Sequence, residues 1–244
     1  MLNSALDTPA LAAALRDRGR LVVQDVLNPE AAARVHAGLS SGVPWRLAFR
    51  DNRLDGRAAQ KSLTQEAFRA LGPGGGAAVS STVMHQARDG FQYLYESFDI
   101  KGGRAAGEAP GHVLYELYDF LNGEDFLDFA RQLTGDDELN DVYAHATRYL
   151  PGHFLKEHED VTDWDNRRYA YVLGLTPDWP SDGGGLLYFH GPGGVVEETF
   201  LPGYNTLSVF AVPIPHSVSM VAPWVRQPRL AVTGWLRVSL SDSA

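Results

Sequence analysis

Residues 148–160 read RYLPGHFLKEHED, a strand-like run that ends in two chemically distinctive side chains. His158 and Asp160 are two positions apart, and in an extended chain this spacing places both on one face. An imidazole and a carboxylate on one face can bind one metal ion together. The pair is a weak signal by itself, because a His and an Asp two apart occur by chance in many chains. The acidic neighbours Glu157 and Asp165 also suit a solvated loop.

The chain around this run, from residue 141 to 238, consists of short apolar or alternating runs separated by Pro, Gly and Asp. Seven of these runs are predicted strands: 141–150, 169–176, 185–190, 195–200, 206–212, 216–221 and 229–238. Strands of this number and spacing predict a barrel or a double-sheet jelly roll.

Residues 1–140 show a more helical pattern. Apolar spacing and capping residues predict helices at 9–18, 29–40, 113–121 and 124–133, with weaker signals at 62–71 and 76–87. Strands are predicted at 20–27, 45–49 and 91–98, and a loop at 101–111. We therefore expect an α+β fold with a jelly-roll, cupin-like core at 141–238 and N-terminal helices packed on it. No polar, low-complexity linker separates the two parts, so residues 1–244 are predicted to form a single domain.

The composition narrows the class of protein. Among 244 residues, 44% are hydrophobic and 21% are charged, which is ordinary for a globular chain. A net charge of −9 disfavours nucleic acid as a partner. The absence of cysteine excludes disulfides, zinc ribbons, iron–sulfur clusters and thiol nucleophiles, so His, Asp or Glu must hold any metal. With no signal-peptide pattern and no long apolar run, we expect a cytoplasmic protein that does not enter a membrane.

Two downstream residues strengthen the metal hypothesis. His216 begins the run HSVSMV, which a jelly roll can fold back over His158 and Asp160. Two imidazoles and one carboxylate would then form the facial triad of non-haem Fe(II) oxygenases. Arg229 follows thirteen residues later across a Pro-bounded turn, in what looks like a hairpin that would set it opposite the start of the His216 strand.

A guanidinium inside a barrel needs an anion, and bidentate binding of a carboxylate is the use that we expect for Arg229. The alternative is a structural ion pair, with Asp25 or Asp119 as the partner. Among the other residues near the cavity, Trp235, Phe210 and Leu186 are predicted walls or plain core residues.

Between Tyr143 and Leu236, the chain resembles the Fe(II)- and 2-oxoglutarate-dependent dioxygenase superfamily, in particular its prolyl-hydroxylase-like branch. The matching motifs occur in the family's order: RYLPG at 148–152, HED at 158–160, RRYAY at 167–171, DW at 178–179, GGGL at 183–186, VF at 209–210, PHSV at 215–218 and RLAVTGW at 229–235. The upstream segments GRLVVQDVLNPEAA and FLNGEDFLDFARQLTG resemble the N-terminal helices of this branch less specifically.

The resemblance implies a double-stranded β-helix core and specific roles for five residues. His158, Asp160 and His216 would bind Fe(II), Arg229 would hold the distal carboxylate of 2-oxoglutarate, and the Tyr149 hydroxyl would contact the same cosubstrate. No catalytic residue beyond the metal ligands is predicted. The implied reaction uses O2, with ascorbate as a further reductant, and hydroxylates a prolyl residue of a protein or peptide with release of succinate and CO2.

The chain departs from the family pattern at three places. Gly185 stands where an acidic residue is usual, Leu173 and Gly174 stand where a tyrosine is common, and Ala231 stands where a small hydroxyl residue is common. These departures affect the expected cosubstrate contacts and the substrate, and leave the metal ligands untouched.

The substrate stays open at this point. A protein or peptide is the first hypothesis, and Arg167 and Arg168 near the mouth are predicted to contact its backbone or an acidic segment, unless they form a solvated strand end. The alternative is an oxygenase of a free amino acid or other small metabolite. Nucleic-acid demethylation is disfavoured by the charge, and a non-enzymatic cupin-like metal protein is disfavoured by Arg229. Residues 50–112 and 161–168 are the predicted substrate loops.

Overall fold

The computed structural model describes residues 1–51, 59–162 and 165–239. Its helices are α1 (Thr8–Arg18), α2 (Pro29–Ser40), α3 (Gln65–Ala70), α4 (Gly75–Gln86), α5 (Ile100–Ala105), α6 (Val113–Leu121), α7 (Glu124–Thr134) and the short 3-10 helix η1 (Pro192–Gly194). Its strands are β1 (Arg20–Gln24), β2 (Arg46–Asp51), β3 (Ala59–Thr64), β4 (Tyr93–Asp99), β5 (Asp141–Tyr149), β6 (Phe154–His158), β7 (Arg167–Leu175), β8 (Leu187–His190), β9 (Val196–Phe200), β10 (Tyr204–Ala211), β11 (His216–Val218) and β12 (Arg229–Arg237).

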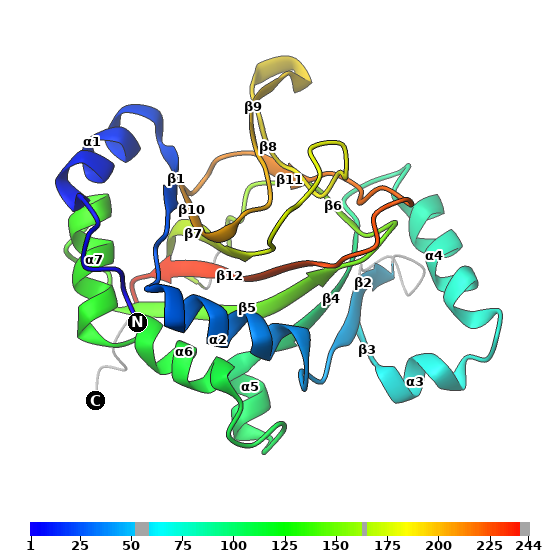
Figure 1. Ribbon diagram of the computed structural model, residues 1–244. Coiled ribbons are helices and arrows are strands. Elements are labelled where there is room, and N and C mark those ends of the chain that lie inside the picture. Colours follow the sequence, from blue (N-terminus) through cyan, green and yellow to red (C-terminus); the bar gives the residue numbers. More distant parts are fainter. Residues whose placement is uncertain (52–58, 163–164, 240–244) are drawn as a thin grey trace.

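The strands form one antiparallel sheet that folds over on itself. Hydrogen-bonded neighbours follow the order β1-β10-β7-β12-β5-β4-β6-β11-β8-β9, and β2 pairs with β3 and β4 at the side. β4 makes the corner, because its residues 96–99 pair with β5 while Tyr93 and Leu94 pair with β6. In Figure 1, β6, β8 and β11 therefore lie above the layer of β12 and β5. This nearly closed barrel confirms the predicted α+β fold with a jelly-roll core.

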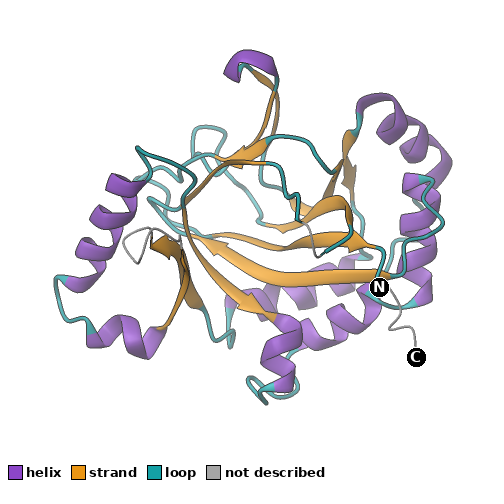
Figure 2. Cartoon of the chain, turned by 180° about the vertical axis from the view of Figure 1, so that it is seen from behind, coloured by secondary structure: helices purple, strands orange, loops and turns teal. Residues whose placement is uncertain are grey.

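Helices cover the outer face of the larger layer. In Figure 2 several helices run below the strands while others lie at the two ends of the sheet, and α2 contacts both β12 and β7. The alternation of β5 explains the packing, because Val142, Ala144 and Ala146 join the main hydrophobic cluster on the helix side. The opposite positions of β5, including Tyr149, face the interior of the barrel.

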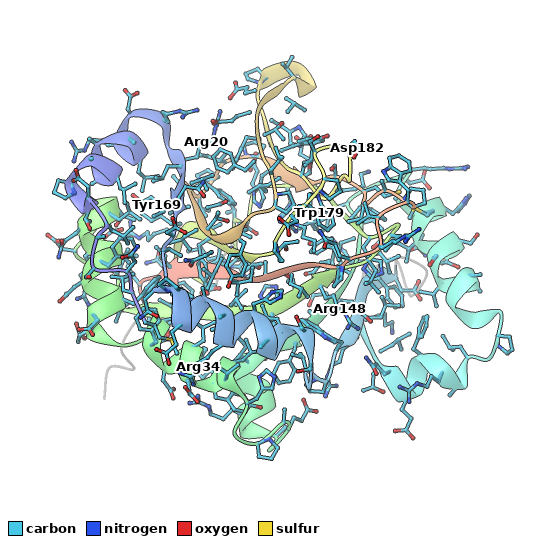
Figure 3. The ribbon with its side chains drawn as sticks, viewed as in Figure 1. Arg20, Arg34, Arg148, Tyr169, Trp179 and Asp182 are labelled. Atoms are coloured by element: carbon cyan, nitrogen blue, oxygen red, sulfur yellow. The ribbon has the colours of Figure 1, made fainter. Side chains whose placement is uncertain are left out.

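A second, smaller hydrophobic cluster fills the space between the two layers. It contains Trp179, Phe189, Phe210 and Val218, all buried. Figure 3 shows this division: Trp179 lies above β12, whereas Tyr169 lies toward α7, where its hydroxyl donates to the Thr134 carbonyl at 3.4 Å. The residues predicted to bind the metal and the cosubstrate lie on the face of the sheet that lines the interior of the barrel.

The N-terminal part contains more strand than expected. Residues 59–64 form β3, which pairs with β2, so the predicted helix at 62–71 is wrong in its first three residues and begins only at Gln65. Thr64 caps that helix by accepting from the Ala67 N–H. The loop predicted at 101–111 is helical over its first part, in α5.

One strand of the core was missing from the predicted seven, and one prediction about strand pairing was wrong. β6 was not among the seven predicted strands, yet it pairs with β4 and β11. β11 and β12 do not form a hairpin, because β11 pairs with β6 and β8 whereas β12 pairs with β5 and β7. The segment between them crosses from the smaller layer to the larger one. Among the described helices, none is both long and apolar enough to span a lipid bilayer.

Candidate active site

A cavity of about 570 Å³ opens between the two layers of the sheet. Its lining includes five of the residues singled out in the sequence: His158, Asp160, His216, Arg229 and Tyr149. They come from β6, the turn after it, β11, β12 and β5. The fold therefore brings together residues up to 80 positions apart in the chain.

His158 and His216 are cross-strand neighbours. β6 and β11 are paired so that His216 lies opposite His158, and the two ring centroids are 4.2 Å apart. The Asp160 carboxylate faces both imidazoles, with one oxygen 3.4 Å from Nε2 of His158 and the other 3.4 Å from Nε2 of His216. One donor atom from each residue lies within 4.8 Å of the other two.

The hydrogen bonds of both histidines fit a metal site. Nδ1 of His158 lies 2.9 Å from the Lys156 carbonyl, and Nδ1 of His216 lies 2.8 Å from the Ile214 carbonyl. A carbonyl can only accept, so each Nδ1 donates and the lone pair of each neutral ring is on Nε2. Two lone pairs and a carboxylate that converge repel one another. A divalent cation between the three atoms, or a proton on Nε2, relieves this repulsion, so the donor set suits Fe(II).

Asp160 reaches this position by a turn rather than along an extended strand. β6 ends at His158, and Asp160 has a left-handed backbone with φ of 61°. The predicted mechanism for the pair, two side chains on one face of a strand, is therefore wrong although the pair does converge. Burial by itself would raise the pKa of Asp160, but the adjacent imidazoles of His158 and His216 outweigh burial and hold this pKa well below its ordinary value.

Arg229 is buried beside Tyr149. It is 4% exposed, β12 pairs it directly with Tyr149, and its guanidinium lies 4.9 Å from the tyrosine ring. Burial lowers the pKa of Arg229, whereas the neighbouring Tyr149 raises it. Burial likewise raises the pKa of Tyr149, and Arg229 lowers it.

Within the described ranges, no acidic residue forms an ion pair with Arg229. Asp119, one of the two partners considered from the sequence, pairs with Arg104 at 2.6 Å instead. Arg229 is thus a buried cation that faces a cavity and has no counter-ion among the described residues. A carboxylate ligand would supply one.

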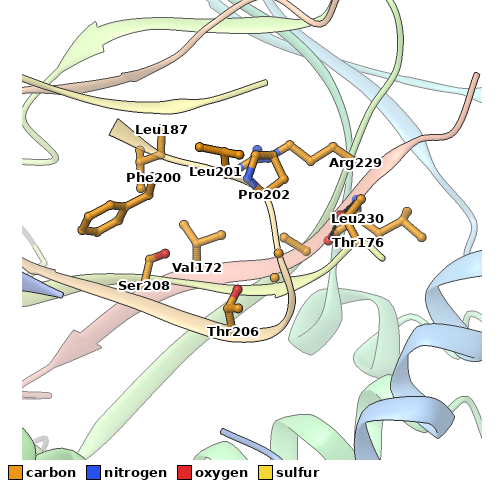
Figure 4. A pocket seen from close by; sticks show the side chains of 13 residues that line it. Val172, Thr176, Leu187, Phe200, Leu201, Pro202, Thr206, Ser208, Arg229 and Leu230 are labelled. Carbon is orange, nitrogen blue, oxygen red and sulfur yellow. Dashed lines mark hydrogen bonds between the residues drawn. The ribbon is translucent and has the colours of Figure 1, made fainter. Parts of the chain in front are cut away.

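The barrel leaves little free space on the other side of Arg229. A second, very small space of about 10 Å³ lies there, with Phe200, Leu201, Pro202 and Thr206 around it (Figure 4). It has room for no more than one water molecule. Arg229 therefore lies between this small space and the large cavity, and only the large cavity of these two has room for a ligand that binds it.

Aromatic side chains of β4 form one wall that the sequence reasoning missed. Tyr93 and Tyr95 line the cavity, and Tyr95 stacks on Tyr149 with ring centroids 5.0 Å apart. Phe91, just before β4, lies 5.4 Å from the His158 ring. The alternation in FQYLYESF contained this signal, because its aromatic residues at 91, 93 and 95 share one face of a strand.

His145 is a second missed residue of the cavity. It lies on the same face of β5 as Tyr149, and Nε2 is 3.4 Å from the Thr233 hydroxyl. Burial lowers the pKa of His145 to about 4, although the charges of Asp99 and Asp160 act in the opposite direction. The ring is therefore neutral at pH 7. The alternation at 143–149 would have placed it beside Tyr149.

The two arginines predicted at the mouth have different positions. Arg167 lines the cavity and contacts Asp160 and Asp165. Arg168 is absent from the cavity lining and pairs with Glu138 at 2.8 Å. Of the predicted walls, Trp235 and Phe210 line the cavity, but Leu187 rather than Leu186 does so, because the strand alternation is offset by one residue.

Comparisons with known proteins agree with this geometry. Residues 144–237 match the family model of the 2OG-Fe(II) oxygenase superfamily. Over 159 residues the chain is 30% identical to prolyl 3-hydroxylase OGFOD1 from Xenopus laevis, a match that covers 62% of this chain. The chain spans only 29% of the length of that relative.

Solved structures show the same fold. A prolyl-4-hydroxylase from Pseudomonas putida matches with a TM-score of 0.55 and 20% identity, over 96% of this chain and 100% of that one. A prolyl hydroxylase from Trichoplax adhaerens, in complex with a peptide fragment of the hypoxia inducible factor oxygen degradation domain, matches with a TM-score of 0.58 and 17% identity, over 95% and 89%. The resemblance predicted from the sequence is thus confirmed: residues 144–237, which contain the three metal-ligand candidates as well as Tyr149 and Arg229, match the 2OG-Fe(II) oxygenase superfamily, a family of oxygenases whose reactions use Fe(II), 2-oxoglutarate and O2.

Proposed function

We propose that this chain is an Fe(II)- and 2-oxoglutarate-dependent hydroxylase that acts on a prolyl residue of a protein or peptide and releases succinate and CO2. The observation that carries the proposal is that one cavity is faced both by a cluster of His158, Asp160 and His216 and by a buried arginine that has no counter-ion among the described residues. The cluster of two imidazoles and a carboxylate suits Fe(II), and the arginine suits a carboxylate ligand.

The residues divide the work as follows. His158, Asp160 and His216 would hold Fe(II), and because only one ligand is anionic, one net positive charge would remain on the centre. Arg229 would bind the distal carboxylate of 2-oxoglutarate through its fork, and the Tyr149 hydroxyl would contact the same group. The aromatic walls keep water away from the reacting atoms. Bound iron would supply the activation of O2 and the oxidative decarboxylation of the cosubstrate.

Three observations support a prolyl substrate. The relative from Xenopus laevis and the two solved structures are all named as prolyl hydroxylases. The cavity wall contains Phe91, Tyr93, Tyr95 and Trp235, which suit the apolar pyrrolidine ring. The net charge of −9 favours a protein or peptide over nucleic acid. Ascorbate remains our expectation as an additional reductant.

The alternative is a free amino acid or another small metabolite. The volume of about 570 Å³ lies within the ordinary range of small-molecule sites, so it also suits this class of substrate.

The test combines binding with product analysis. Fe(II) and 2-oxoglutarate are titrated without oxygen, and the loaded protein is then given air, proline-containing peptides, free amino acids and lysate proteins. We expect succinate and a peptide product 16 Da heavier, located on proline by tandem mass spectrometry. Asp160→Ala is the control, and it should bind little metal and form no product while keeping its fold. Oxidation of free amino acids alone would favour the alternative substrate class, and absence of succinate would overturn the proposed reaction.

A further inference from the structure

Asp160 has an unusual local structure for a metal-ligand candidate. It lies beyond the end of β6, so it is outside the strand ladder that fixes His158. Its left-handed backbone is tolerated by aspartate but is less stable than the extended or right-handed conformation. Its side chain is only 8% exposed. Neighbouring groups must therefore hold both its backbone and its carboxylate in place.

Arg167 contacts Asp160 at both of these points. Its Nη1 donates to the Asp160 carbonyl oxygen at 3.3 Å and lies 3.9 Å from the carboxylate oxygen Oδ1. This Oδ1 is also the oxygen that lies 3.4 Å from Nε2 of His158. The guanidinium therefore acts on the backbone turn and on the ligand atom at the same time.

The Arg167 side chain is itself fixed on two further sides. Its Nε donates to Oδ2 of Asp165 at 2.8 Å, and its guanidinium lies 3.5 Å from the centroid of the Trp235 ring. Asp165 is held in turn by Arg237, whose Nη1 lies 2.8 Å from Oδ1. A guanidinium that stacks on an aromatic ring and makes two hydrogen bonds keeps one orientation, and the ammonium group of a lysine could not reproduce these contacts.

The next residue provides an internal comparison. Arg168 points to the other side of β7, where it pairs with Glu138 at 2.8 Å and lies outside the cavity. The two adjacent arginines, both assigned to the substrate from the sequence, thus have different neighbours. Only Arg167 contacts a metal-ligand candidate.

We propose that Arg167 is a positioning residue for the metal centre, and that it holds the Asp160 carboxylate where it can share a cation with His158 and His216. The proposal rests on the proposed function as far as the metal is concerned, and it replaces substrate contact as the main role of Arg167. Outer partners of metal ligands typically change metal affinity by about 10–100-fold when they are removed.

The experiment measures metal binding without turnover. Co(II) is titrated anaerobically into the full-length wild type, Arg167→Gln, Arg167→Lys and the matched control Arg168→Gln, with calorimetry and the visible absorption of Co(II) as readouts. We expect the Kd for Co(II) to rise about 10–100-fold in Arg167→Gln, with a changed absorption spectrum, and to rise less in Arg167→Lys. Arg168→Gln should bind Co(II) with the wild-type Kd and spectrum.

Circular dichroism and melting temperature show whether each variant folds. If Arg167→Gln does not fold, Asp165→Asn tests the same support from one contact further away, and it should raise the Kd in the same direction. A wild-type Kd and spectrum in the folded Arg167 variants, with only the KM for peptide raised, would overturn the proposal in favour of substrate contact. Failure of the proposed function would give different results. If the wild type binds Co(II) but hydroxylates no substrate, the proposed activity is refuted and the role of Arg167 is not. If the wild type binds no Co(II), the proposed activity and the role of Arg167 are both refuted.

Discussion

At the scale of single residues, the most unusual group is the buried guanidinium of Arg229. It is 4% exposed and has no acidic partner among the described residues, so the folded protein bears the cost of desolvating a charge. Such a residue contributes to ligand binding at the expense of stability. Stability and ligand affinity should therefore respond in opposite directions when Arg229 is replaced.

Arg229→Met tests this opposition. Because methionine fills much of the same space without a charge, we expect the ligand-free variant to melt at a higher temperature, by about 2–4 °C for each kcal/mol gained. Its binding of 2-oxoglutarate, measured by calorimetry with Mn(II), should be lost, while Mn(II) itself binds normally. Arg148→Met is the matched control: Arg148 pairs with Glu96, so its loss should lower the melting temperature. Retained 2-oxoglutarate affinity in Arg229→Met would assign the arginine a structural role.

His145 should make stability depend on pH. Burial lowers its pKa to about 4 in the folded protein, against about 6.5 in an unfolded chain. Between these two pH values, His145 is protonated in the unfolded chain but stays neutral in the folded protein. The free energy of unfolding therefore falls as the pH drops from about 6.5 to about 4. The loss from this residue is on the order of 2–3 kcal/mol.

Urea denaturation at pH 7 and pH 4.5 measures this effect. His145→Phe should show a smaller difference in unfolding free energy between the two pH values than the wild type. An equal difference in both proteins would mean that His145 is not the group responsible. His153→Phe serves for comparison, because burial also lowers the pKa of His153, away from the cavity lining.

At the scale of elements, β12 is the central strand, since it pairs with β5 on one side and β7 on the other and carries Arg229. Gly234 of β12 pairs with Ala144 of β5 on one side and with Tyr171 of β7 on the other. A Cβ atom added there would be 1.8 Å from the Tyr143 carbonyl oxygen, so β12 and β5 would have to move apart. The glycine is needed for this close approach of backbones.

Gly234→Ala should therefore destabilise the protein by several kcal/mol, on the order of 3 or more. Gly90→Ala is the control, because a Cβ added at Gly90 meets no atom within 4 Å and should change stability little. Chemical denaturation of both variants gives the two free energies. Similar stability for both would show that the β12–β5 pair can relax around a methyl group.

Local elements were predictable where the pattern is local. The Asn28 cap followed by Pro29, and the apolar spacing of 113–134, give α2, α6 and α7 almost to the residue. The strand β6 and the partners of β11 were missed, since strand pairing depends on residues far apart in the chain. The same holds in the site: the ligand residues were identified from the sequence, but the left-handed turn at Asp160, the β4 wall and the contacts of Arg167 depend on tertiary packing.

At the scale of the whole molecule, the sheet lies between two hydrophobic clusters, one under the helices and one between the layers. The N-terminal part contributes β1 and β4 to this sheet, so both parts of the chain share its hydrogen bonds. We propose, as expected from the sequence, that residues 1–244 form a single folding unit.

A single unit should unfold in one step. Far-UV circular dichroism, which follows mainly the helices, and tryptophan fluorescence, to which the inner Trp179 contributes, should give the same midpoint in urea. Mn(II) with 2-oxoglutarate at about 100 times its Kd should shift both midpoints together, by about 2.7 kcal/mol in free energy. Two separate transitions, with only the fluorescence one responding to ligand, would mean that the helical part folds independently.

Each of the two metal-ligand histidines is oriented by a carbonyl two residues earlier in the chain, that of Lys156 for His158 and that of Ile214 for His216. The aim of both rings is thus encoded in two three-residue segments and in the register that sets them opposite each other. This pair of histidine segments depends on few other residues for its geometry. A designer could transplant it to another antiparallel pair of strands by copying six residues and one register, and the remaining effort would go into building the turn that presents the third ligand.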